Sequence, residues 1–307
     1  MANEVLYTAS GDARLAEVLS ADMQLVLADR FSLWGSPAIH YAGSASMSGS
    51  TVIKVPIVSA NGVDRMAAVA ENAATANTAL TLASATVTIA RQALQRQISD
   101  LNEMVDSVGV NSQLLLNDMV GAAAMRFQEL LANITDDFTS TVGSTTVDLS
   151  ADDWFSAQFA LTQASVAGNT RLALLYPTQV TDLQNSARSE AGAFQYRQDV
   201  SSFLEPKGQG EMGTFLGTPI LASSLVPTAN AGADSAGGLW GFGAVTYADG
   251  TPAPIRGSGE VVYPAGQKLY VEFERDAAGA LTKIVGNYFV GVSILQDAMG
   301  VSIITDR

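Results

Sequence analysis

The chain has 307 residues, of which 48% are hydrophobic and only 15% are charged, and its formal net charge is −14. This length and composition predict one large or two medium folded domains and exclude a disordered chain. The acidity argues against specific binding to phosphate backbones, and the absence of cysteine excludes disulfides and thiolate metal sites. No stretch of about 20 residues lacks polar interruption, so the sequence predicts no membrane span.

The first 38 residues predict a partly helical arm. Residues 13–30 carry apolar side chains at helical spacing, and Pro37 ends the segment. The N-terminus lacks the basic and the continuous apolar segments of a secretory signal, so we expect synthesis in the cytoplasm. An apolar excess without a membrane span also suggests surface that is buried elsewhere, for example between subunits.

Residues 39–90 predict a long excursion from the folded region. Residues 43–50 are small and flexible, residues 51–58 form a first strand, and residues 80–90 alternate as a second strand. Pro56 has no N–H for a ladder bond, which predicts an edge or partly paired strand. Because a projecting two-stranded ribbon is marginal alone, we expect it to lie on another surface.

A long helix dominates residues 91–147. Ser99 is expected to cap a short helix through Val105, and residues 112–134 then predict a helix of about six turns. Its apolar stripe consists of Leu116, Val120, Ala123, Phe127, Leu130 and Ile134. Such a stripe is typical of a core helix under a sheet.

The remaining sequence predicts short α/β units followed by a β-rich end. Residues 150–153 resemble a capping box, and residues at helical spacing follow it. That stripe is Phe155, Phe159, Thr162 and Val166. We expect strands at 171–176, 218–222, 239–246, 268–274, 281–295 and 300–305, a helix from Pro177 with Val180, Leu183 and Ala187 on one face, and loops at 188–214 and 228–238.

Catalytic and cofactor-binding patterns are missing from the sequence. His40 is the only histidine, and we interpret it as a surface or packing residue. Residues 239–243 are glycine-rich, but no helix follows to present N–H groups to a phosphate. Asp152 and Asp153 fit the first turn of a helix better than acid–base chemistry. The sequence therefore predicts no catalytic, cofactor or metal site and no enzyme.

The order of these elements resembles the major capsid proteins of tailed bacteriophages with the HK97-type fold. The matching stretches are GSTVIKVPIV, LTLASATVTIA, NSQLLLNDMVGAAAMRFQELLANI, SADDWFSAQFAL, TRLALLYPTQVTDLQ, GEMGTFLGTPILASSLVP and GLWGFGAVTY. The resemblance covers nearly the whole chain. It implies an α+β fold with an N-terminal arm (1–38), an E-loop (39–90), a P-domain with a spine helix (91–147), an A-domain (148–262) and C-terminal P-domain strands (263–307).

The resemblance also implies a function. We expect a structural subunit that assembles into pentamers and hexamers of an icosahedral head, in the virion, around DNA that it does not bind specifically. Portal, scaffolding or cement proteins are further expected partners. Encapsulins, which share the fold and enclose cargo enzymes, are the nearest alternative, and an α/β hydrolase and a sheath or tube subunit are more distant ones.

Three residues of the excursion are the candidate contact residues between subunits: Lys54, Pro56 and Arg65. Some members of the family cross-link an E-loop lysine to an asparagine of a neighbour. Lys54 lies within a strand and no asparagine partner can be chosen, so we interpret it as an edge-strand lysine that deters wrong pairing. We also expect no cleavage of an N-terminal scaffolding segment.

Overall fold

The structure is a computed structural model of the chain. It describes residues 38–46, 50–58, 68–69, 71, 73–74, 82–100, 110–189, 213–251 and 269–307. The predicted arm, apart from Ala38, and the candidate contact residue Arg65 lie outside these ranges.

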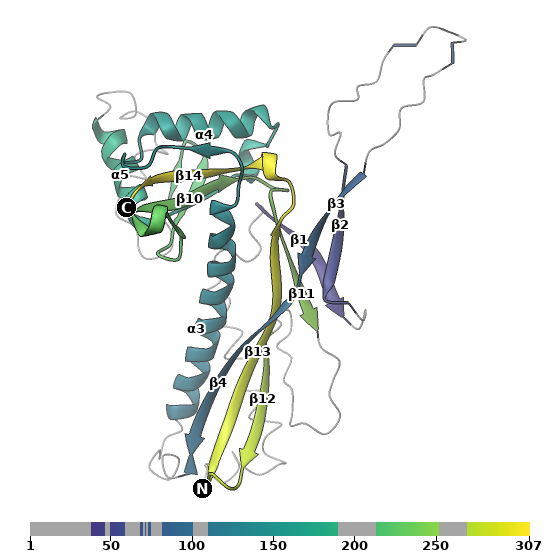
Figure 1. The fold of residues 1–307 in the computed structure, drawn as a ribbon, viewed down its shortest axis with the longest axis vertical. Helices are drawn as coiled ribbons and strands as arrows, with labels where there is room; N and C mark the ends of the chain where they lie inside the picture. Colours follow the sequence, from purple (N-terminus) through teal and green to yellow (C-terminus); the bar gives the residue numbers. More distant parts are fainter. Residues whose placement is uncertain are drawn as a thin grey trace.

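Three sheets and three long helices build the described part of the chain (Figure 1). The five-stranded sheet contains β1 (Ile39–Ser46), β4 (Ala90–Ser99), β11 (Val245–Thr251), β12 (Leu269–Asp276) and β13 (Leu281–Ile294). The seven-stranded sheet contains β5 (Thr141–Val142), β6 (Leu172–Leu175), β7 (Thr214–Phe215), β8 (Thr218–Ala222), β9 (Thr228–Ala229), β10 (Asp234–Trp240) and β14 (Gly300–Asp306). The two-stranded ribbon is β2 (Val52–Val58) with β3 (Leu82–Thr88), and the helices are α3 (Val110–Asn133), α4 (Ala151–Gln163) and α5 (Pro177–Ser189).

The five-stranded sheet is long because its 14-residue strand β13 pairs with three other strands. Antiparallel β4 and β12 flank the first part of β13, and β11 pairs with its end. Helix α3 runs along this sheet, as Figure 1 shows, and buries Val120 and Phe127 completely against it. The predicted helix over 112–134 is thus confirmed, although its best-buried stripe is Met119, Val120, Ala124, Phe127, Leu131 and Ile134.

Strand β4 corrects the sequence analysis. The sequence predicts no strand between residue 91 and Ser99, yet a ten-residue strand paired with β13 ends at Ser99. Asp100 is helical, as expected of a helix capped by Ser99, and the rest of the predicted helix through Val105 lies outside the described residues. The alternation in β4 is carried by Gln92, Leu94 and Ile98, of which only two are apolar. A polar strand of this kind gives a weak period-2 signal, and its partner strand lies about 190 residues away in sequence.

The glycine-rich region around residues 228–246 also differs from expectation. The predicted loop over 228–238 contains β9 and most of β10, and the predicted strand over 239–246 is divided between β10 and β11 by a turn at 241–244. Small residues suit β10 because both of its faces are crowded. A Cβ on Gly237 would lie 2.5 Å from Gln179 Oε1, and one on Gly238 would lie 2.7 Å from Thr135 Cγ2.

Strand β1 is the third correction. Residues 43–46, predicted to be flexible, continue a strand that pairs in parallel with β11 across an irregularity between Tyr41 and Ser44. Gly43 has a φ of +112° in this stretch, which a residue with a side chain rarely adopts. The neighbouring strand β11 therefore orders a segment that has no apolar pattern of its own.

Helix α4 starts as predicted but buries a different stripe. Ser150 accepts a hydrogen bond from the Asp153 N–H and Asp153 accepts one from the Ser150 N–H, which is a complete capping box. The residues that face the sheet are Ala151, Trp154, Ala157 and Leu161. Phe155 and Phe159, which predict the helix by their spacing, are 45% and 62% exposed.

The end of α3 is fixed to the seven-stranded sheet by tight contacts. Buried Thr135 Oγ1 lies 2.6 Å from both the Ala132 and the Ala236 carbonyl oxygens and donates to one of them at a time. The Ser302 hydroxyl donates to the Thr135 carbonyl, and Gly300 lies against the Phe138 ring. This junction couples the spine helix to β10 and β14.

Candidate interaction surfaces

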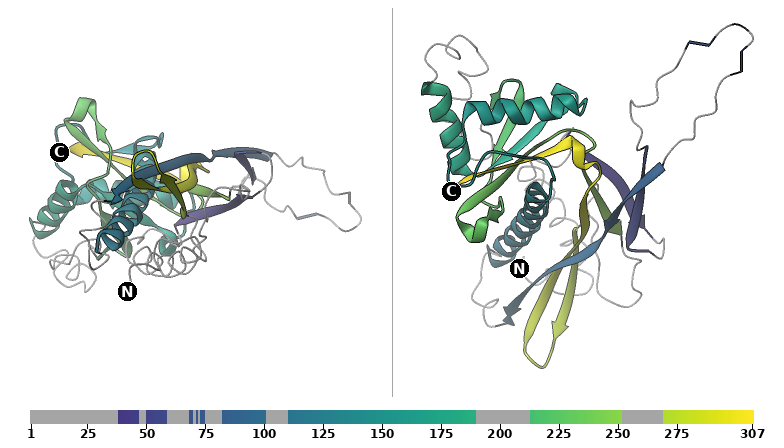
Figure 2. Two further views of the ribbon diagram at one scale, coloured as in Figure 1. Left: turned by 90° about the horizontal axis from the view of Figure 1, so that it is seen from below. Right: turned by 45° about the horizontal axis from the view of Figure 1, so that its top comes forward.

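The β2–β3 ribbon projects away from the rest of the fold, and Figures 1 and 2 show this from three directions. Its inner end is anchored. Val87 and Ile89 are buried with Ala248 of β11, and partly buried Ile53 and Val55 pack against them. The Ile89 N–H donates to the Thr51 carbonyl at 2.8 Å. The ribbon therefore shares a small core with the five-stranded sheet at one end only.

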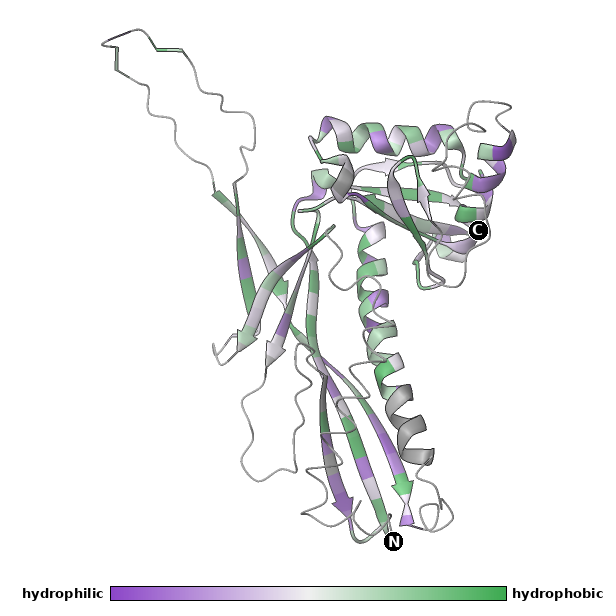
Figure 3. Ribbon diagram, turned by 180° about the vertical axis from the view of Figure 1, so that it is seen from behind, coloured by the Kyte–Doolittle hydropathy of each residue, from purple (hydrophilic) through white to green (hydrophobic). Residues whose placement is uncertain are grey.

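One face of the ribbon is open along its whole length. Directly opposed residues of an antiparallel pair share a face, so the register places four side chains on the same side. We call this surface the outer hairpin face: Val52, Lys54, Pro56 and Leu82. Val52 is 37% exposed and Leu82 is 63% exposed, and Figure 3 shows the mixture of apolar and polar residues along the ribbon.

Two of the three predicted contact residues therefore lie together. Lys54 opposes Thr86 and Pro56 opposes Ser84, and both side chains are exposed on the outer hairpin face. The prediction that Pro56 lies in an edge strand is confirmed, because β2 pairs only with β3 in the described part of the chain. Leu82, which is also exposed on this face, was not singled out from the sequence, where it counted as one member of an alternating strand.

A second exposed surface covers the C-terminal half of α4. Phe159 lies three residues before Thr162 on the helix, and the Arg171 guanidinium donates to the Thr162 hydroxyl at 3.0 Å and to the Val166 carbonyl at 2.8 Å. It also donates to the Gln158 side-chain oxygen. No carboxylate of the described residues forms an ion pair with Arg171, and burial lowers its pKa.

Acidic residues gather at the opposite end of α4. The pKa of Asp182 is raised, first by burial and then by the negative charges of Asp148 and Asp306. Val147, next to Asp148, is 51% exposed, and its carbonyl accepts a hydrogen bond from the Asp306 N–H at 3.1 Å. The sequence could not reveal this group, because its members come from three distant segments.

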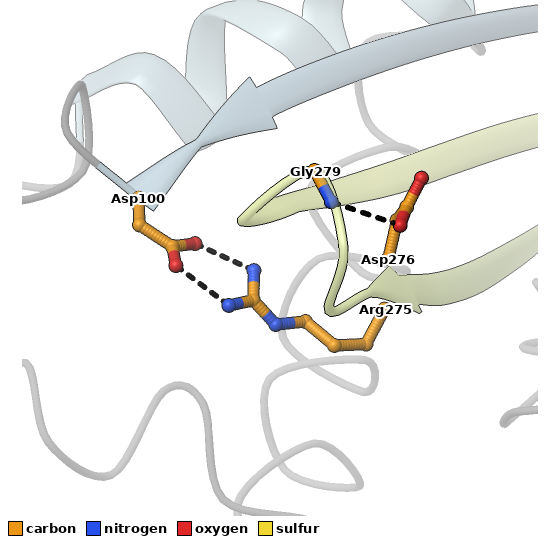
Figure 4. Close-up of polar contacts among 4 residues, drawn as sticks. All are labelled: Asp100, Arg275, Asp276 and Gly279. Atoms are coloured by element: carbon orange, nitrogen blue, oxygen red, sulfur yellow. Dashed lines mark hydrogen bonds and ion pairs between the residues drawn. The ribbon is translucent and has the colours of Figure 1, made fainter.

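An ion pair closes the far tip of the five-stranded sheet (Figure 4). The two terminal guanidinium nitrogens of Arg275 donate to the Asp100 carboxylate, at 2.5 and 2.6 Å, and the Gly279 N–H donates to Asp276 at 3.1 Å. The hydrogen bond from Arg275 lowers the pKa of the Asp100 carboxyl. Since both partners are exposed, this pair orients the end of β4 more than it stabilises the fold.

The residues that could have carried chemistry have structural surroundings. His40 Nδ1 lies 3.1 Å from Thr246 Oγ1, and its ring packs edge-on to Phe242. A Cβ on Gly241 would lie 2.0 Å from Val166 Cγ1, so the glycine-rich turn provides space for packing. Asp153 belongs to the capping box. The predicted packing role of His40 and structural role of these glycines are confirmed.

Neither a metal nor a membrane site emerges from the described ranges. No three His, Asp or Glu side chains within them are grouped so as to hold a metal ion. Within the same ranges, no helix has the length and apolar character needed to cross a bilayer.

Comparison with known proteins gives a clear result for structure and none for sequence. No family model and no curated protein matches the sequence. The capsid of cyanophage P-SCSP1u superposes with a TM-score of 0.61 at 15% identity, covering 87% of this chain and 86% of that chain. The capsid of Ralstonia phage GP4 superposes with a TM-score of 0.60 at 12% identity, covering 89% and 90%.

The chain has the HK97-like capsid fold. The predicted α+β class and fold are therefore confirmed. The SrpI encapsulin complex of Synechococcus elongatus also superposes, with a TM-score of 0.56 at 13% identity over 85% of this chain and 84% of that chain. The HK97-like fold thus occurs both in phage capsids and in an encapsulin among the solved structures that this chain resembles.

Proposed function

We propose that this chain is the major subunit of an icosahedral phage-type head and assembles into pentamers and hexamers. The observation that carries the proposal is the outer hairpin face, on a ribbon that projects from a fold otherwise found in capsids. Leu82 is 63% exposed at its outer end and belongs to no core cluster of the described residues. A neighbouring copy would supply the missing surface, as expected for a lattice of identical subunits.

The domains of the fold follow from this proposal. Residues 1–38 are the N-arm, 39–90 the E-loop, 91–147 the P-domain with α3 as spine helix, 148–262 the A-domain, and 263–307 the C-terminal P-domain strands. Strand β11 lies within 148–262 although it pairs with β13, so the chain crosses between the two sheets inside that range. The contact of Thr135 Oγ1 with the Ala236 carbonyl joins the P-domain to the A-domain, and β14, within 263–307, pairs with β10 of the A-domain range.

The chemistry of the chain agrees with a passive container. A net charge of −14 repels phosphate, so a shell lined by this chain encloses DNA without binding it specifically. We place the assembled protein in the virion after synthesis in the host cytoplasm, with no cofactor and no catalytic role. Portal, scaffolding or cement proteins are the further partners that such a head uses.

Contacts across subunits in this proposal centre on the E-loop. Lys54 and Pro56 on the outer hairpin face, together with Arg65 from the same excursion, contact an adjacent copy. Lys54 acts there through its charge and its long apolar stem, without a covalent bond. Because each such contact is small, a closed lattice is needed to make the assembly stable.

Electron microscopy of the purified full chain tests the proposal directly. We expect closed shells with five-fold and six-fold clusters of subunits. Tubes, or a lone globule that persists at high protein concentration and under varied salt, would contradict it.

The structural likeness to the SrpI encapsulin supports one alternative, a protein compartment shell. The two functions differ in what the shell contains. Particles isolated from the natural host separate them, because a head contains packaged nucleic acid and a compartment contains a cargo protein. Nuclease-protected DNA supports the first function, and a stoichiometric cargo enzyme supports the second.

A further inference from the structure

The two exposed surfaces at the ends of α4 have opposite chemistry. The cationic patch is Phe159 and Arg171, and the acidic patch is Val147, Asp148, Asp182 and Asp306. Each patch combines at least one half-exposed apolar side chain with charge of a single sign. Such a combination is typical of the centre and rim of a contact between proteins.

The charge of each patch is unbalanced within the chain. Arg171 forms hydrogen bonds only to neutral acceptors, although it is partly buried beside the C-terminal turn of α4. At the other end, Asp148 and Asp306 repel Asp182. Arg307 follows Asp306 in sequence, but its guanidinium contacts Tyr176 and not these carboxylates: it lies 4.7 Å from the centre of the Tyr176 ring. Bringing the two patches together therefore relieves an unfavourable field at each.

One copy cannot join its own patches. The Ala151 N–H at the start of α4 donates to Ser186 of α5, the helix that carries Asp182, and the Arg171 contacts lie at the end of α4. Thirteen residues of helix separate these two ends, which is a span of about 20 Å. Figure 1 shows α4 lying across the top of the seven-stranded sheet between them.

A two-fold contact also fails to join them. An isologous interface through either patch would set Arg171 near its own copy, or the three carboxylates near theirs, and like charges across an interface are unfavourable. A head-to-tail contact pairs the cationic patch of one copy with the acidic patch of the next. When the rotation between copies closes, this arrangement produces a ring.

We propose that the two ends of α4 form a head-to-tail contact between neighbouring copies, in which Phe159 and Arg171 of one copy meet Val147, Asp148 and Asp182 of the next. This inference rests on the proposed function, and it adds which two surfaces of neighbouring subunits meet in the ring. The charges direct the order of the subunits, and the apolar residues supply the contact. Because the patches are small compared with a stable interface, the contact is weak until the ring closes.

The absence of cysteine from the chain allows a direct test by site-specific cross-linking. The double variant Val147→Cys with Phe159→Cys is assembled and treated with a flexible bis-maleimide of about 10 Å reach. We expect a ladder of covalent oligomers that ends at the ring size, and no cross-linked product from either single variant. A second pair, Val147→Cys with Ser156→Cys, leaves both phenylalanine rings in place.

The matched control replaces Phe159→Cys with Met125→Cys, which is 56% exposed on α3 and outside both patches. We expect this control pair to give no ladder. Dimers from a single variant would overturn the inference in favour of a two-fold contact. Microscopically intact shells in which neither test pair cross-links would overturn it while leaving the proposed function standing, whereas a wild-type chain that never forms rings or shells overturns both.

Charge exchange provides an independent measurement. Asp182→Lys, at a partly exposed position, should raise the protein concentration required for assembly about tenfold, and Gln163→Glu on the exposed face of α4 should restore much of the loss when combined with it. Unchanged assembly of Asp182→Lys would contradict the charge pairing.

Discussion

The seven-stranded sheet has both faces covered within its own chain, whereas the β2–β3 ribbon is covered on one face and at one end. The sheet packs α4 and α5 on one side and the end of α3 on the other, and buries Trp154, Phe215 and Leu239 almost completely. In β3 of the ribbon, Val87 near the end of the strand is buried, whereas Leu82 at its start is 63% exposed. The sheet thus buries its core side chains within the described chain, whereas the proposed assembly would cover the open face of the ribbon with a neighbouring copy.

This difference separates residues that fold the chain from residues that assemble it. Substitutions in the sheet and its junction should lower the free energy of unfolding and affect assembly only through folding. Substitutions on the outer hairpin face should leave the free energy of unfolding unchanged and reduce assembly alone. Each of the following changes tests one side of this division.

The largest effect on folding should come from Gly238→Val. A Cβ at this position would lie 2.7 Å from Thr135 Cγ2 and 2.8 Å from Thr135 Cβ, so the end of α3 must move away from β10. We expect a loss of about 3 kcal/mol in the free energy of unfolding, measured by denaturant titration. Gly168→Ala is the control, because no atom lies within 4 Å of its added Cβ, and it should be close to neutral.

A somewhat smaller loss should follow Gln179→Ala. This fully buried side chain donates to the Ser235 and Ile303 carbonyls at 3.1 and 3.0 Å and accepts from the Tyr176 N–H at 3.0 Å. Its removal leaves buried backbone groups without partners, so we expect a loss of about 2 kcal/mol in the free energy of unfolding. A value near zero would mean that the hydrogen bonds around α5 contribute little to the sheet.

The ribbon should respond in the opposite way. Leu82→Ser removes an exposed side chain, so the free energy of unfolding should change by less than about 0.5 kcal/mol while the yield of assembled particles falls. Ala83→Ser, on the other face of the same strand, is the control and should assemble normally. If Leu82→Ser destabilises the isolated chain instead, the ribbon packs on its own subunit and the division fails.

The smallest effect should come from Arg275→Gln at the tip of the five-stranded sheet. Because Arg275 lowers the pKa of the Asp100 carboxyl, the pair stabilises the fold above the ordinary pKa of 3.8, and this contribution disappears as the pH falls through the lowered value. NMR titration should show the Asp100 pKa rising in the variant. The wild-type shift should shrink at high salt, since both partners are exposed.

Local patterns predicted most of the regular elements correctly. The strand at Leu172–Leu175, the helix from Pro177 and the long α3 follow from apolar spacing and helix-start signals alone. The same holds for the ribbon, and hence for the exposure of Lys54 and Pro56, because alternation within a strand fixes the face of each residue.

Elements that depend on distant partners were missed. Strand β10 is rich in glycine and alanine because Gln179 and Thr135 pack closely against it, and the sequence of β10 alone does not reveal these contacts. The aromatic stripe of α4 faces outward because Trp154 and Leu161 already fill the core beneath it. The acidic patch exists only after folding brings three separate segments together.

Hydrogen–deuterium exchange of the ribbon, compared between assembled particles and dissociated subunits, tests the central claim most directly. If a neighbouring copy covers the outer hairpin face, amides of residues 52–58 and 82–88 should exchange much more slowly in particles, while those of β10 should be equally protected in both states. Equal exchange of the ribbon in particles and in free subunits would contradict the account.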